Sequence, residues 1–293
     1  MRAIAFTLIA GLLAAPLAAQ AKDRPTISLP MSAKWEINYD TDSCHLLAQF
    51  GQGEDLLIMR MTRFEPGSPF DLMLYGKMFA TEKTWVPLRL GFGDTAMVER
   101  QAGAGTAGKL AFVIAMHMRV DIAKWPKPVA DDEITDGPVT PEAEAKITAI
   151  TVAMRNGKNY RLETGSLAKP MQALRDCTDN LLTSWGYDPK IQANLGRRVT
   201  SIGSPAAWLT TNDYPADALR AGHNGIIQFR LDVDERGKVA GCHVLRRFKP
   251  DDFAKLTCDL LTKRAHFEPA LDAANKPVKW YYINTVRFVI PDY

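Results

Sequence analysis

The side chains that could carry catalysis or bind a metal are scattered along this sequence. Its five histidines lie at positions 45, 117, 223, 243 and 266, outside any HExxH, Gly-x-Ser-x-Gly or phosphate-binding glycine motif. Two of them, His45 and His243, directly follow a cysteine. Neighbouring residues on a strand point to opposite faces, so neither pair can converge on one metal ion. The sequence therefore predicts no enzyme, no cofactor and no metal site.

Two short motifs allow a chemical interpretation beside a structural one. Met116–Met118 places a histidine between two methionines, and these ligand types suit copper. On a strand the methionines would face away from the histidine, so we favour core packing. Gly93–Thr95 resembles an aspartic-protease loop, but that mechanism needs two coupled carboxylates and a second such motif is missing. Neither motif is therefore taken as a site.

The first 21 residues have the composition of a secretory signal peptide. Arg2 supplies the positive charge, residues 3–15 the apolar stretch, and Ala19–Ala21 a small-x-small cleavage site. Residues 3–21 are alanine-rich and interrupted by Pro16, which is marginal for a helix that spans a bilayer. We expect cleavage, a periplasmic protein and no stable membrane span. An uncleaved N-terminus anchored in the inner membrane is the alternative.

Four cysteines in a chain addressed to an oxidising compartment predict disulfide bonds. Three pairings are formally possible. Cys177 lies on the apolar stripe of a predicted helix over residues 166–185, and Cys44 lies on an early strand, so we predict that this pair staples helix to sheet. Cys242 lies in a predicted hairpin and Cys258 in the helix that covers it, so we predict the second bond between them.

Length and composition favour two globular domains of the α+β class. The chain has 293 residues, of which 46% are hydrophobic and 24% charged, enough apolar residues for two cores. Its net charge of +3 comes from interleaved acidic and basic residues, so nucleic acid is not expected as a partner. We predict a signal peptide over 1–21, a β-rich domain over 22–190, a linker over 191–211 and a C-terminal domain over 212–293.

The N-terminal domain is predicted to be a sandwich or barrel of short strands. Hydrophobic runs bounded by Gly, Pro, Asp or Ser occupy residues 35–39, 44–50, 56–64, 70–78 and 85–92. The glycine- and alanine-rich residues 101–108 are interpreted as an exposed turn or loop. Residues 110–120 fit a buried strand or a core helix, and residues 147–154 and 160–163 fit a hairpin that turns at Asn156–Gly157.

The C-terminal domain shows a clear order of helix, strand, strand, helix and strand. A short helix ends at Gly222, a strand starts at Gly225, and a turn over Asp234–Gly237 leads into a second strand. Pro250 is a good start for a helix, and alternating apolar residues from Trp280 to Ile290 predict a long last strand.

Alternation also predicts which faces of the hairpin are buried. On the first strand the predicted core residues are Ile227, Phe229, Leu231 and Val233, and on the second they are Ala240, Cys242 and Val244. Between the core residues of the first strand, Gln228, Arg230 and Asp232 are predicted to face water.

These elements resemble the C-terminal domain of TonB, the energy transducer of Gram-negative bacteria. The resemblance covers about residues 212–291 and rests on the Tyr214–Pro215 start, the Gly225 strand, the turn after Asp234, the helix ending in residues 264–269 and the closing strand. It implies a three-stranded antiparallel sheet with two helices, which in the family grips a short peptide of an outer-membrane receptor.

The resemblance also implies where a partner would bind. An exposed sheet edge offers unpaired N–H and C=O groups that an added strand can satisfy. The last strand, Lys279–Ile290, is the candidate edge, and its predicted partner-binding residues are Tyr281, Ile283, Thr285, Arg287 and Val289. Isolated domains of this kind with free edges can pair with each other, so a homodimer stays open.

The chain differs from the family's transducer in two respects. A TonB that transduces energy needs a retained membrane helix and a long proline-rich arm, whereas here the first segment looks cleavable and a folded domain occupies the place of the arm. We therefore expect a periplasmic protein that binds an outer-membrane receptor or another envelope protein, with TonB-dependent transport as one setting for this binding. The alternative is a periplasmic small-ligand-binding or envelope assembly protein that recognises through its N-terminal domain.

Overall fold

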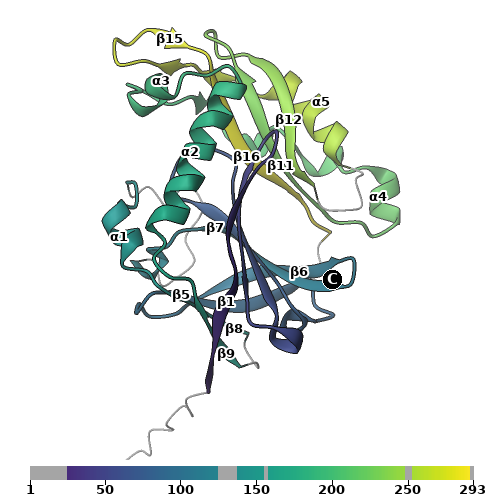
Figure 1. The fold of residues 1–293 in the computed structure, drawn as a ribbon. Helices are drawn as coiled ribbons and strands as arrows, with labels where there is room; N and C mark the ends of the chain where they lie inside the picture. The colour runs from purple at the N-terminus through teal and green to yellow at the C-terminus, as the bar shows by residue number, and fades with distance from the viewer. Residues whose placement is uncertain (1–24, 125–136, 155–157, 248–252, 291–293) are drawn as a thin grey trace, which may run out of the picture.

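The computed structural model describes residues 25–124, 137–154, 158–247 and 253–290 (Figure 1). The predicted signal peptide, the Asn156–Gly157 turn and the helix start at Pro250 lie outside the described residues. Within those ranges, every helix is too short or too polar to cross a membrane.

The N-terminal part is a closed barrel, one of the two architectures that the strand spacing predicts. Around the barrel the order is β1-β2-β3-β4-β7-β6-β5-β8-β9, and β1 closes it by pairing antiparallel with β2 and parallel with β9. The strands are β1 (Thr26–Tyr39), β2 (Cys44–Phe50), β3 (Leu57–Arg63), β4 (Phe70–Tyr75), β5 (Trp85–Phe92), β6 (Val98–Ala107), β7 (Leu110–Met118), β8 (Ile150–Met154) and β9 (Asn159–Glu163).

The barrel interior is a packed apolar core. Inward-facing side chains of alternate residues fill it, and Phe50, Leu72, Leu88 and Val152 are each 0% exposed. Burial of one such side chain contributes about 1.5–3 kcal/mol, so the filled interior is a main source of stability. Short turns of 3-10 helix accompany the fold: η1 (Gly53–Asp55), η2 (Lys77–Phe79), η3 (Ile122–Lys124), η5 (Pro205–Ala207) and η6 (Thr211–Asp213).

The prediction of a loop over residues 101–108 is wrong, because most of this segment belongs to β6. β6 pairs with both β5 and β7, and its small residues leave room for bulky neighbours. A Cβ on Gly103 would lie 3.3 Å from the Ile114 side chain and 3.8 Å from the Trp85 ring. The glycines thus accommodate close packing across the strands, which local sequence does not distinguish from a loop.

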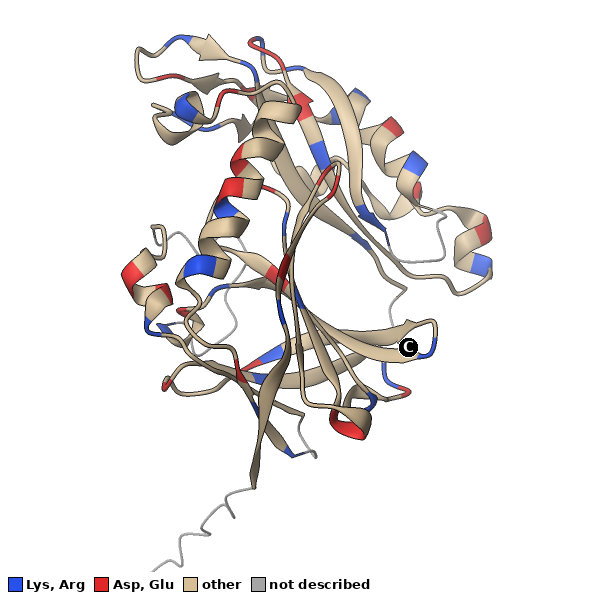
Figure 2. Ribbon diagram, viewed as in Figure 1, with Lys and Arg blue, Asp and Glu red and all other residues tan. Residues whose placement is uncertain are grey.

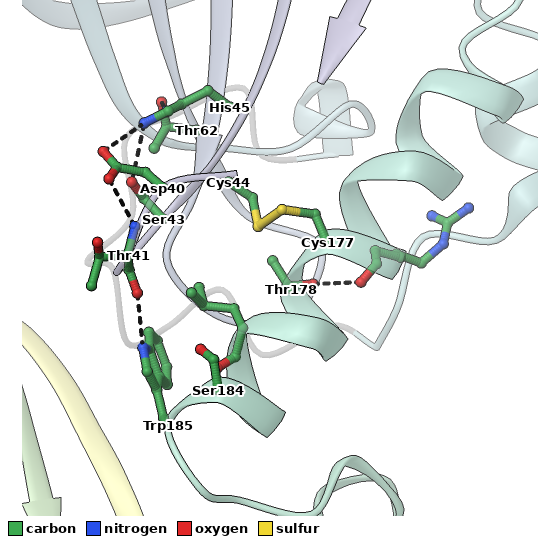
Figure 3. Close-up of a disulfide and its surroundings, with 12 residues drawn as sticks. Asp40, Thr41, Ser43, Cys44, His45, Thr62, Cys177, Thr178, Ser184 and Trp185 are labelled. Carbon is green, nitrogen blue, oxygen red and sulfur yellow. Dashed lines mark hydrogen bonds and ion pairs between the residues drawn. A yellow bond between two sulfur atoms is a disulfide. The ribbon is translucent and has the colours of Figure 1, made fainter. Parts of the chain in front are cut away.

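Helix α2 (Ala168–Ser184) joins the barrel to the C-terminal part (Figure 1). Met171, Leu174 and Leu181 extend the barrel core, whereas Leu182 packs in a cluster with residues of the C-terminal part. The predicted disulfide between Cys44 on β2 and Cys177 on α2 is confirmed, with the two Cα atoms 6.0 Å apart (Figure 3). The short helix α1 (Pro141–Ala145) packs against α2.

The C-terminal part contains the predicted order of elements. These are α4 (Ala216–Arg220), β11 (Gly225–Val233), β12 (Val239–Arg247), α5 (Ala254–Arg264) and β16 (Trp280–Phe288). The strands form a three-stranded antiparallel sheet of order β12-β11-β16, and Leu261 and Ala265 pack on its apolar face. The second predicted disulfide, Cys242–Cys258, ties β12 to α5. The α+β fold class is confirmed.

The segment expected to be a linker, residues 191–211, packs against the C-terminal sheet and its surroundings. Trp208 is 5% exposed and lies in the same core cluster as Phe229. The remaining short elements are α3 (Pro189–Ala193), β10 (Thr200–Ser201), which pairs with β13 (Phe267–Glu268), and the hairpin of β14 (Ala270–Leu271) with β15 (Pro277–Val278).

Candidate functional site

The two edges of the C-terminal sheet differ in regularity. β16 pairs with β11 over nine consecutive residues, from Trp280 to Phe288, without a shift in register. β12, at the other edge, has two irregularities against β11, one near Leu245 and one at Ala240. Bulges twist and interrupt a strand and are a common protection of edges against pairing. β16 is therefore the edge better suited to accept another strand.

The irregularities in β12 also change which of its residues are buried. Val244 pairs with Phe229 on the helix-covered face, but Arg246 pairs with Gln228 and so lies on the opposite face. At the other irregularity Val239 takes the place opposite Val233, and Ala240 is exposed. The prediction that Ala240 lies in the core is thus wrong, because the extra residue shifts the alternation by one.

Hydrogen bonding indicates which backbone groups of β16 point away from the sheet. The Thr285 N–H donates to the side-chain oxygen of Asn284 at 2.7 Å, so it does not serve the ladder with β11. In an antiparallel ladder this direction alternates, so the N–H and C=O groups of Ile283 and Arg287 also point outward. The outward backbone groups thus belong to the alternate residues predicted to bind a partner.

The structure divides the five predicted binding residues into two groups. Tyr281 is buried at 3% exposure, and Ile283 and Thr285 are half-buried. Arg287 is exposed, and Val289, just past the strand, is 61% exposed. The second half of the strand is thus open, and the first half lies beneath neighbouring elements.

The sheet face opposite α5 packs against the barrel and the end of α2, which corrects the prediction that Gln228, Arg230 and Asp232 face water. Gln228 and Arg230 are 7% and 3% exposed. Asp232 is half-buried and accepts a hydrogen bond from the Tyr187 hydroxyl at 2.9 Å. The predicted alternation of the two faces is correct, but a second layer covers the polar face.

Arg230 makes the most enclosed of these contacts. Its Nη1 lies 2.9 Å from the Asp42 carboxylate in the turn between β1 and β2, and its guanidinium stacks 3.7 Å from the centroid of the Trp185 ring. The Trp185 indole N–H in turn donates to the Thr41 carbonyl at 3.2 Å (Figure 3). The ion pair with Asp42 and the stacking on Trp185 together compensate for the burial of the Arg230 charge.

Arg246 makes a second contact with the barrel. Its Nη1 lies 2.5 Å from Asp71 Oδ2 on β4, and its guanidinium lies over the Phe64 ring at 4.8 Å. The other Asp71 oxygen accepts from the His117 backbone N–H at 2.9 Å, where β7 bulges and His117 adopts a φ of 53°. The strained backbone at this bulge thus orients the Asp71 carboxylate that pairs with Arg246.

Tyr281 is held at the same interface. Its hydroxyl hydrogen-bonds Glu65, in the loop after β3, and accepts from the Gln192 side chain of α3 at 2.9 Å. Burial raises the pKa of the Glu65 carboxyl, although Arg198 and the Tyr281 hydrogen bond oppose the shift. The Tyr281 ring also meets the Trp185 ring edge-on at 5.7 Å between centroids. The first half of β16 is therefore covered by the end of α2, by α3 and by a barrel loop.

Sequence reasoning missed this interface because its partners are far apart in the chain. Asp42 and Arg230 are separated by 188 residues, and Asp71 and Arg246 by 175. Acidic and basic residues are mingled along both parts of the chain, so charge pattern does not single out these pairs (Figure 2). The bulky Trp185 and Tyr187, at and just after the end of a predicted helix, were the available signal.

One cluster on the barrel has the residue types of a hydrolase but a different geometry. The Ser43 hydroxyl lies 3.1 Å from His45 Nε2, and Asp40 approaches the same nitrogen at 3.8 Å (Figure 3). His45 Nδ1 instead faces the Thr62 hydroxyl at 3.0 Å. A catalytic triad needs the carboxylate on the nitrogen opposite the serine, so this cluster has no such arrangement.

The Met116–Met118 motif, which the sequence offered as a copper site, has a structural place instead. Met118 is buried in the barrel core, and His117 lies in the bulge at the interface. Across the described ranges, His, Cys, Asp and Glu side chains form no group of three that could hold a metal ion.

Comparison with known proteins identifies the C-terminal part. Residues 210–290 match the family model described as the Gram-negative bacterial TonB protein C-terminal. No curated protein matches the chain. The family is an interaction domain of the bacterial envelope, and the match confirms the resemblance over the same segment.

Proposed function

Residues 210–290 form a TonB C-terminal domain, and from this premise we propose that the chain binds an extended segment of an outer-membrane receptor or another envelope protein along β16. One observation carries the proposal: β16 is a regular strand at the edge of its sheet, whereas the other edge, β12, is interrupted twice. The partner segment would become a fourth strand and satisfy the outward backbone groups of β16.

The proposed binding site is the open second half of β16 together with Val289, which follows it, so that it covers residues 284–289. Here Thr285 and Arg287 direct backbone groups outward, and Arg287 and Val289 are exposed. Main-chain hydrogen bonds would supply affinity, and side chains beside Thr285 and Arg287 would add specificity. The predicted signal peptide and the two disulfides support a periplasmic setting, where thiols pair and persist as disulfides.

The alternative, recognition of a small ligand by the N-terminal domain, receives less support. Apolar side chains fill the barrel interior, so a ligand would have to bind outside it. The domain instead contributes a surface that packs on the C-terminal sheet. We therefore propose transport-related protein binding as the function, with the barrel as part of the binding protein.

A proline in the edge tests the proposal. Arg287→Pro removes an N–H that points away from β11, so the edge strand should still pair with β11 while an added strand loses a donor and meets the ring. We expect affinity for synthetic peptides spanning the periplasmic N-terminal segments of outer-membrane receptors to fall about tenfold, the effect of one lost hydrogen bond to the backbone. Fluorescence anisotropy of labelled peptides measures this.

Arg287→Ala is the matched control, because it removes the side chain and keeps the N–H. We expect this variant to retain most of the affinity, and thermal unfolding should confirm that both variants are folded. Equal affinity of Arg287→Pro and the unmodified chain for a bound peptide would rule out strand addition at this edge.

A further inference from the structure

The domain interface covers part of the strand to which we assign partner binding. Tyr281, near the start of β16, is 3% exposed beneath Trp185 and the barrel residue Glu65, whereas Val289 is 61% exposed. We propose that the barrel, together with the end of α2 that it holds, is an autoinhibitory element: docked on the sheet, it covers the first half of β16, and its separation uncovers Tyr281 and leaves more of the strand open to a partner. This inference rests on the proposed function of β16.

Two arginine–aspartate ion pairs between the sheet and the barrel help to hold the docked arrangement. Arg230 joins Asp42 and the Trp185 ring, and Arg246 joins Asp71. Both arginines project from β11 and β12 on the face opposite α5, so neither is part of the β16 edge. The contacts can therefore be changed without altering the strand that accepts the partner.

The interface contains features that water would relieve on separation. The side-chain oxygen of Gln228, which lies beside Arg246 in the sheet, is buried without a hydrogen-bond partner in the described structure. The Glu65 carboxyl is desolvated against Tyr281. The unsatisfied and desolvated groups cost free energy in the docked state, which lowers the free-energy cost of opening.

The barrel side of the interface is firmly braced. The Cys44–Cys177 disulfide links β2 to α2, and the two cysteines are 0% and 1% exposed. Cys44 is two residues from Asp42, and the Trp185 indole bonds Thr41 in the same turn (Figure 3). Separation is therefore expected between this braced unit and the sheet face, and the barrel itself stays intact.

The test compares the rates of amide hydrogen exchange in the unmodified protein and in the double variant Asp42→Asn, Asp71→Asn. NMR resolves these rates to single residues. Asparagine keeps an oxygen for the His117 N–H and removes both charges. We expect the outward amides of Tyr281 and Ile283 to exchange slowly in the full chain and about tenfold faster in the variant. Arg287, already open, should be unchanged, as should the amides of β3 and β7.

A second variant, Arg230→Gln with Arg246→Gln, changes the interface from the sheet side and should give the same result. Asp217→Asn with Glu54→Gln is the matched control, because both carboxylates form exposed surface pairs. Unchanged exchange at Tyr281 and Ile283 in both interface variants would overturn the inference, as would fast exchange at these amides in the full chain. No partner enters this measurement, so its outcome is independent of the peptide-binding test.

Discussion

Removal of the Cys44–Cys177 disulfide by the double substitution Cys44→Ala, Cys177→Ala is expected to lower the free energy of unfolding by about 5 kcal/mol. The cross-link spans 133 residues, and a long closed loop restricts the unfolded chain strongly. It also braces the turn and helix end that hold Arg230. Urea unfolding of the oxidised proteins, followed by circular dichroism, measures the difference.

The second disulfide provides the comparison. Cys242–Cys258 spans 16 residues, and the same chain-entropy relation gives about 3 kcal/mol for Cys242→Ala, Cys258→Ala. Loss of the long-range disulfide is therefore expected to cost more stability than loss of the short-range one. A larger loss on removal of Cys242–Cys258 would show that the long-range bond does not brace the fold as described.

Replacement of Gly237 by alanine is expected to destabilise the C-terminal domain by roughly 3 kcal/mol. Gly237 has a φ of 78° in the turn between β11 and β12, a region that costs an alanine about 1–2 kcal/mol. An added Cβ would also lie 1.8 Å from the Phe267 carbonyl oxygen, so the backbone would have to move. Thermal unfolding should show the loss.

Gly222→Ala separates the two contributions. Gly222 has a similar φ of 69° but no atom within 4 Å of an added Cβ. Only the conformational cost of about 1–2 kcal/mol is expected there. Equal destabilisation by the two substitutions would mean that the contact with Phe267 carries no energy and that the turn packs differently.

Much of the C-terminal domain could be predicted because its local signals agree with its tertiary structure. Ile227, Phe229, Leu231 and Val233 alternate on β11 as expected, and all face the helix-covered core. Cys242 and Cys258 lie on the two elements that must pack together, so their pairing followed from the order of elements. The same reasoning joined Cys44 to Cys177.

The errors have a common physical origin in contacts that are distant in the sequence. β6 is glycine- and alanine-rich because Trp85 and Ile114 occupy the space beside it, which only the paired strands reveal. Ala240 lies outside the core because the pairing of β12 with β11 is irregular at this position, which period-two alternation cannot anticipate. Arg230 has the alternation of a solvent-facing residue, yet a partner 188 residues away buries it.

For the candidate site, the sequence predicted the edge strand but not the residues that pack over its first half. The family resemblance placed the candidate edge at residues 279–290, and the regular register of β16 supports that choice. That Tyr281 would be enclosed by Trp185, Gln192 and Glu65 depended on how the barrel packs. Under the proposal that the barrel is autoinhibitory, the interface adds a level of control that the C-terminal domain alone would lack.

In-cell photo-crosslinking tests the central claim most directly. A benzoylphenylalanine at Val289, beside the open half of β16, is compared with one at Ala240, which is also exposed but lies on the interrupted edge strand β12. We predict crosslinks from Val289 to an envelope protein and few or none from Ala240. Equal crosslinking from both positions, or a product from Val289 that contains only a second copy of this chain, would contradict the account.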